Sequence, residues 1–229
     1  MKTKDAPFID IHTHHASHAM TFGIHPWWLD DPDYLFSQDL SRLESLLKEN
    51  KIAAIGETGI DRLHKATLPL QIEMFEKHIL LSEQYRKPLI IHNVRGTDEI
   101  LRLYKKYQPK QPWIIHGFNG NEAEVRLFTE KGIYLSVGES LFYENRKVAK
   151  AITSIPLDHL FLETDTSEKT IQEVYEKAAE RLNLPLGVLK ERIFANFARL
   201  NLDVWNSGMT EHDCSSATMA LKSLDGAMC

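Results

Sequence analysis

Short apolar runs alternate with longer amphipathic segments along most of the chain. The short runs are continuous rather than alternating, which is typical of strands buried on both faces of a parallel sheet. The longer segments repeat their apolar positions every three to four residues, which predicts helices. We expect strands at residues 8–14, 19–24, 52–57, 89–93, 113–117, 133–137 and 160–165. Their alternation with helices predicts an α/β fold with a parallel sheet.

The helices are expected at about residues 41–49, 68–85, 97–107, 121–130, 146–153, 171–182 and 186–198. Ser41 and Glu44 have the spacing of a capping box, so we expect the first helix to begin at Asp39 or Ser41. Asn121 is expected to cap the fourth helix. The apolar residues beyond position 206 follow neither the pattern of a helix nor that of a strand. We therefore predict a single domain over residues 1–206 and a C-terminal tail of low order at 207–229.

The first two expected strands lie too close together in the sequence for an ordinary crossover. Parallel neighbours are usually joined by a dozen or more residues, and residues 16–20 are too few. Seven strands also fall one short of a complete β/α barrel. We expect a TIM-like β/α barrel that is seven-stranded or incomplete between the first strand and Gly23. Strand 19–24 should then lie beside the first strand, with the open edge covered by a loop, the tail or a second subunit.

The composition is that of an ordinary globular protein, with 43% hydrophobic and 26% charged residues among 229. The formal net charge of -5 argues against a protein that coats nucleic acid, although an enzyme acting on it is not excluded. No apolar run approaches the roughly 20 residues needed to span a membrane. Cys214 and Cys229 do not imply a disulfide framework, which fits a reducing cytoplasm.

Five of the expected strands end in a residue that can bind a metal ion. In a β/α barrel the carboxyl ends of the strands meet on one face, where chemistry is placed. Any single polar strand end is more often structural, but the repetition at the same end of five strands favours a metal site. The candidate ligands are His12, His14, Glu57, His92, His116 and Asp165.

The residues around these positions resemble the TatD family of metal-dependent hydrolases. The resemblance covers residues 8–201 and is carried by the segments 10–14, 23–26, 56–61, 91–92, 116–120, 163–165 and 196–200. It implies an amidohydrolase-like barrel, for many members a metal-dependent deoxyribonuclease activity, and the same six residues as metal ligands. The chain departs from the family in its shortened region before Gly23, in Arg62 after Asp61, and in Val94 between Asn93 and Arg95.

Imidazoles and carboxylates without thiolates suit Zn, Mn, Co or Mg. Six ligands are too many for one tetrahedral zinc and suit two ions, with Glu57 as the bridge. The expected cofactor is thus one or two divalent ions, Zn, Mn or Mg. Asp165, the last residue of its strand, can both bind a metal and take the proton of the attacking water. Glu163 is expected just behind the ligands.

Residues that contact substrate are harder to identify from the sequence. His25 is a candidate for substrate contact, or alternatively a histidine fixed beside Pro26 in a tight turn. Arg95 can bind a phosphate through its planar fork, or alternatively be a solvated loop charge. Trp27 and Trp28 can form a stacking platform for bases, or pack the loop that carries them.

The leading hypothesis is a metal-dependent hydrolase that cleaves phosphodiester bonds of DNA, from an end, by metal-activated water. The same ligands would serve hydrolysis of a carboxylic ester, a lactone or an aminoacyl bond. A third hypothesis, a metal-binding scaffold without turnover, is disfavoured because structural zinc sites are closed and four-coordinate. Nucleic acid is thus expected as substrate, for a cytoplasmic monomer or small homo-oligomer.

Overall fold

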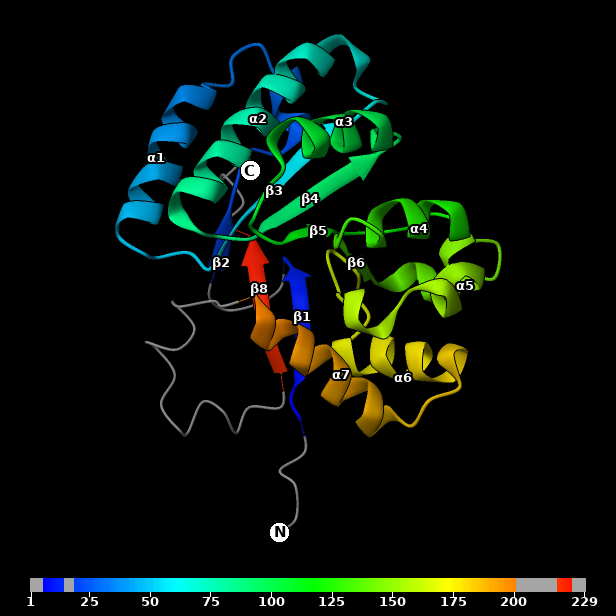
Figure 1. Ribbon diagram of the computed structural model, residues 1–229. Helices are drawn as coiled ribbons and strands as arrows, with labels where there is room; N and C mark the ends of the chain where they lie inside the picture. Colours follow the sequence, from blue (N-terminus) through cyan, green and yellow to red (C-terminus); the bar gives the residue numbers. More distant parts are fainter. Residues whose placement is uncertain (1–5, 15–18, 201–217, 224–229) are drawn as a thin grey trace.

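The computed structural model describes residues 6–14, 19–200 and 218–223. Eight parallel strands form one sheet in the order β1-β8-β2-β3-β4-β5-β6-β7, with helices outside it (Figure 1). The strands are β1 (Phe8–Thr13), β2 (Ala19–Phe22), β3 (Ala54–Asp61), β4 (Leu89–Val94), β5 (Trp113–Ile115), β6 (Tyr134–Val137), β7 (Leu160–Leu162) and β8 (Thr218–Ser223). The α/β barrel-like fold is therefore confirmed, and each of the seven expected strands is present.

The helices are α1 (Phe36–Lys48), α2 (Leu68–Tyr85), α3 (Thr97–Tyr107), α4 (Glu122–Thr129), α5 (Lys147–Ala151), α6 (Ile171–Leu182) and α7 (Leu186–Arg199). Asn121 caps α4 in a capping box with Glu124, as expected. The expected start of α1 is wrong. The helix already begins at Phe36, and the Ser41 hydroxyl donates to the Ser37 carbonyl within it. None of the described helices is both long and apolar enough to cross a membrane.

The eighth strand comes from the segment that we predicted to be a tail of low order. Thr218–Ser223 form β8, which pairs in parallel with β1 on one side and β2 on the other (Figure 1). The low-order prediction is wrong for these residues, and so is the prediction that β2 lies beside β1. A distant segment needs no short crossover, so it can occupy the place that the β1–β2 link cannot fill. We expected the tail, a loop or a second subunit to cover this open edge. Residues 218–223 of the tail cover it by pairing as a strand with β1 and β2.

The predicted domain boundary at residue 206 lies outside the described residues, and so do Cys214 and Cys229. The edge strands β1 and β7 are joined by one isolated parallel bridge between Thr13 and Asp165, not by a ladder. Two backbone hydrogen bonds of 3.0 Å form it, from His14 N–H to the Asp165 carbonyl and from Asp165 N–H to the His12 carbonyl. The sheet is therefore not fully closed, but this bridge sets Asp165 beside both histidines of β1.

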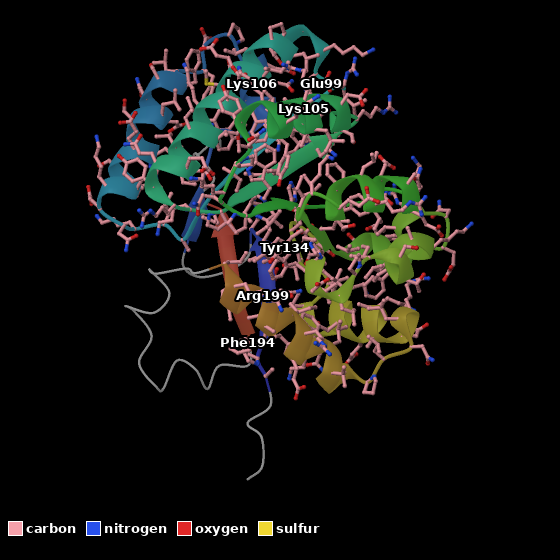
Figure 2. The ribbon with its side chains drawn as sticks, in the orientation of Figure 1. Glu99, Lys105, Lys106, Tyr134, Phe194 and Arg199 are labelled. Atoms are coloured by element: carbon pink, nitrogen blue, oxygen red, sulfur yellow. The ribbon has the colours of Figure 1, made fainter. Side chains whose placement is uncertain are left out.

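The core holds the strand that carries these histidines firmly in place. All six residues of β1 are buried, and α6 and α7 pack against it. The hydroxyl of Tyr175 on α6 accepts a hydrogen bond from Ile9 N–H (3.0 Å) and donates one to the Ile9 carbonyl (3.1 Å). The outer layer is also cross-linked, for example by Lys106 of α3, which is labelled in Figure 2. Its ammonium donates a hydrogen bond to Glu76 of α2 at 2.6 Å. Helix packing and buried hydrogen bonds thus support the strand that ends in these histidines.

Candidate metal centre

Glu57, in the middle of β3, lies at the centre of a cluster of imidazoles. Its Oε1 atom is 2.6 Å from His116 Nε2, 2.8 Å from His92 Nδ1 and 3.1 Å from His25 Nε2. Gly59 permits the close approach of β3 to β4, because a Cβ there would lie 2.2 Å from the His92 carbonyl oxygen. The imidazoles of His25, which follows β2, of His116, which follows β5, and of His92 within β4 are thus brought onto one carboxylate oxygen.

The other oxygen of Glu57 faces the histidines of β1. Oε2 is 3.4 Å from His12 Nε2 and 3.7 Å from His14 Nε2. Asp165 Oδ1 completes this side, at 3.3 Å from His14 Nε2 and 3.6 Å from His12 Nε2. The structure thus brings together all six residues that the sequence singles out as candidate ligands.

The donor atoms form three overlapping groups, each within 4.8 Å. They are His12, Glu57 and His116; His12, His14 and Asp165; and His25, Glu57 and His92. In the described part of the chain, the ring nitrogens of His12 and His116 form no hydrogen bond of good geometry, although both rings are buried and their Nε2 atoms lie 3.4 Å and 2.6 Å from Glu57. Buried polar atoms without a partner are costly, and a divalent ion would satisfy them. The donor set therefore fits a metal ion.

The charge states of the carboxylates in the cluster also fit a metal ion. Burial would raise the pKa of Glu57, but the imidazoles around it, His116 first, hold that pKa well below its usual range. Burial would also raise the pKa of Asp165, but the contact with His14 and the nearby His116 and His12 together lower it. Burial lowers the pKa of the His116 imidazole. Ionised carboxylates and neutral imidazoles are the forms that bind metal ions. In the cluster without an ion, burial would lower the pKa of His92, but Asp61 and Glu57 outweigh it and raise that pKa to about 9, so metal binding there would release a proton.

Asp61, at the end of β3, is a site residue that the sequence reasoning missed. Its Oδ2 accepts a hydrogen bond from the Trp27 indole N–H at 2.7 Å and is 3.3 Å from His92 Nε2. This contact turns the opposite nitrogen of His92 toward Glu57. The alternation of side chains along a strand would have indicated Asp61, because residues 57, 59 and 61 share one face of a strand.

Two further buried carboxyl groups support the strand ends. Glu163 accepts a hydrogen bond from Gly117 N–H, and its Oε1 is 3.8 Å from His116 Nδ1. Burial raises the pKa of Glu163 to about 8. Asp10 accepts hydrogen bonds from both the N–H and the hydroxyl of Thr164, at 3.0 and 2.7 Å. Burial raises the pKa of Asp10 to about 6. Both groups lie behind the ligands and fix their backbone.

The two candidate substrate residues are placed differently. His25 lies in the cluster, and its Nδ1 also accepts a hydrogen bond from Trp27 N–H at 3.2 Å, which fixes the turn. Arg95 lies outside the cluster, in the exposed loop after β4. Within the described chain its side chain forms no hydrogen bond or ion pair. The guanidinium of Arg62, in contrast, forms an ion pair, with its Nη1 3.6 Å from Glu99 Oε1.

The model of the family "TatD related DNase" matches residues 9–201. Among individual proteins, the chain is 31% identical to the uncharacterised metal-dependent hydrolase YabD of Bacillus subtilis over 142 residues, which are 61% of this chain and 56% of that protein. It is 32% identical to the human 3'-5' RNA nuclease TATDN2 over 150 residues, 63% of this chain and 19% of that protein. The chain spans about half the length of the bacterial relatives that it matches.

Solved structures show the same fold. The TatD homologue YjjV of Escherichia coli has a TM-score of 0.71 and 23% identity, covering 79% of this chain and 75% of that one. A TatD family hydrolase of Entamoeba histolytica has a TM-score of 0.68 and 16% identity, covering 86% and 99%. The family match extends over most of the chain and includes the strands that carry the six clustered residues. The chain belongs to the TatD family of metal-dependent hydrolases.

Proposed function

We propose that this chain hydrolyses phosphodiester bonds of nucleic acid, with DNA as its substrate, and that it depends on one or two divalent ions, Zn, Mn or Mg. The observation that carries the proposal is the arrangement of three overlapping donor groups around one buried carboxylate, Glu57. The family description names a DNase, and the human relative is an RNA nuclease, which supports phosphodiesters as the substrate class.

Glu57 is the residue best placed to be shared between two ions, because its two oxygens face different imidazoles. His12, His14 and Asp165 would hold an ion on one side of it, and His25 and His92 on the other. Bound divalent ions would polarise a phosphoryl oxygen and lower the pKa of water, and so supply a nucleophile at neutral pH.

Asp165 is proposed as the residue that takes the proton of the attacking water. Its side chain is 37% exposed, against 8% for Glu57 and 0% for His12, so water can reach it more easily than these two. Its lowered pKa keeps it ionised, and therefore able to accept a proton, at neutral pH. Glu57, which is buried among imidazoles, would act through metal binding.

Arg95 is proposed as a phosphate contact. It is exposed and unpaired within the described residues, and it follows the strand that carries His92. With a net charge of -5, binding must rely on such local contacts and not on a general attraction to nucleic acid. The cytoplasmic location and the monomeric or small homo-oligomeric state stay predictions from the sequence.

A substrate panel tests the proposed function. The purified protein is stripped with EDTA, reloaded with Zn, Mn or Mg, and incubated with end-labelled single-stranded DNA, RNA, an aminoacyl-tRNA and a lactone. We expect metal-dependent shortening of DNA that is lost in Glu57→Gln. Hydrolysis of the aminoacyl bond or the lactone without cleavage of either nucleic acid would instead establish the ester-hydrolase alternative.

A further inference from the structure

An exposed indole lies directly beside the donor cluster. Trp27 belongs to the short 3-10 helix Pro26–Asp30, and its side chain is 52% exposed although Pro26 and Leu29 of the same turn are buried. Its ring centroid is 4.9 Å from that of His25 and 5.9 Å from that of His92. Both of these imidazoles contact Oε1 of Glu57. A large apolar surface is thus left open to solvent one side chain away from the central carboxylate.

The indole is nevertheless held in a defined position. Its N–H donates to Asp61 Oδ2 at 2.7 Å. The ring of His64 lies 5.7 Å away at an interplanar angle of 32°, and His64 is itself bonded to Asp30. The rings of His25 and His92 meet the indole nearly edge-on, at 84° and 76°. Such fixation lowers the entropic cost of a later contact, which is how preorganised binding sites gain affinity.

We propose that Trp27 is a substrate-binding residue on which the nucleobase next to the scissile phosphodiester stacks. This inference rests on the proposed phosphodiesterase function and names a subsite for it. Every base has a π-face, so stacking on an aromatic ring binds nucleic acid without sequence preference. A base lies one sugar away from its phosphate. A phosphate at the donor cluster therefore brings its own base to the neighbouring indole.

The test compares two substrates and three variants under the metal conditions that support turnover. The substrates are a single-stranded DNA whose terminal nucleotide carries a base and the same DNA with an abasic terminal residue. Trp27→Ala removes the ring and the N–H, whereas Trp27→Phe keeps an aromatic ring and removes only the N–H to Asp61. Leu63→Ala is the matched control, because Leu63 is also exposed (61%) and also donates an N–H to Asp61, but from its backbone, which the substitution keeps.

Stacking predicts that Trp27→Ala raises KM for the base-bearing DNA by about tenfold or more. We expect kcat to change by less than about threefold and KM for the abasic DNA to stay as in the wild type. Trp27→Phe should recover most of the loss, and Leu63→Ala should behave as the wild type. Thermal melts of all variants verify that the exposed substitutions leave the fold intact.

Three results would overturn the inference. Equal loss of kcat in Trp27→Ala and Trp27→Phe on both substrates would show that the indole N–H only positions Asp61 and His92. Equal KM values of the wild-type protein for base-bearing and abasic DNA would show that no base is bound, while leaving the nuclease function intact. Absence of cleavage of either DNA by the wild-type protein would remove the proposed function, and the subsite with it.

Discussion

A buried histidine outside the metal centre makes the stability of this protein dependent on pH. His78 of α2 is fully buried. Its Nε2 accepts a hydrogen bond from Ile24 N–H at 3.1 Å, and its Nδ1–H donates to the Met74 carbonyl at 2.7 Å. These bonds require the neutral ring and tie the segment before His25 to α2. Burial lowers the pKa of His78 from 6.5 to about 4.

The size of the effect follows from this difference in pKa between the unfolded and folded chains. Because the folded pKa is depressed, the unfolded chain binds the proton more readily, and stability is lost as the pH falls below 6.5. The loss reaches its limit below pH 4, at about 3 kcal/mol. Between pH 7 and pH 5, the free energy of unfolding should fall by about 2 kcal/mol on account of His78 alone.

Urea unfolding of the metal-free protein in EDTA measures this contribution. His78→Gln is the matched variant, since its side-chain oxygen can still accept from Ile24 N–H but does not titrate. The acidic groups of the metal centre titrate in both proteins and cancel in the comparison. Between pH 7 and pH 5, the free energy of unfolding of the wild-type protein should fall by about 2 kcal/mol more than that of the variant. An identical loss in both would refute the assignment of a neutral, buried His78.

Further perturbations test the other parts of the structure. Asp165→Asn should abolish turnover with a smaller loss of bound metal, measured by steady-state kinetics and metal analysis; normal turnover would remove Asp165 from proton transfer. Tyr175→Phe should lower the free energy of unfolding by about 2 kcal/mol, because both backbone groups of Ile9 lose their partner; an unchanged urea midpoint would contradict this. Deletion of residues 207–229 should lower the melting temperature and promote aggregation seen by light scattering, since it uncovers the facing edges of β1 and β2. A truncated protein as stable and monodisperse as the full chain would argue against β8.

The six candidate ligands could be found from the sequence because each follows or ends a short apolar run. The parallel topology then sends all strand ends to one face, so a local pattern determines a non-local cluster. His92 and Glu57 are exceptions in position, since β4 continues beyond His92 to Val94 and β3 continues beyond Glu57 to Asp61. The continuation of β3 made Asp61 a site residue, and the alternation of side chains along a strand was sufficient to find it.

The insertion of β8 could not be predicted in this way. Pairing between residues near 10 and residues near 220 depends on which backbone edges are left open. The spacing of apolar residues within the segment carries no information about which strand edges are open. The start of α1 was missed for a different reason, because the helix begins after Leu35 without any side-chain cap. Signals based on capping residues find helices only where a side chain makes the first hydrogen bonds.

The metal content of Glu57→Gln is the most direct measurement on the proposed centre. The wild-type protein, Glu57→Gln and the control His159→Gln, which changes a histidine outside the cluster, are stripped, reloaded with Zn or Mn, desalted and analysed by plasma mass spectrometry. We expect one or two ions per chain in the wild-type protein and the control, and a loss of metal together with hydrolytic activity in Glu57→Gln. Full metal occupancy in Glu57→Gln, or undiminished activity of the wild-type protein after complete removal of metal, would contradict a metal-dependent site centred on Glu57.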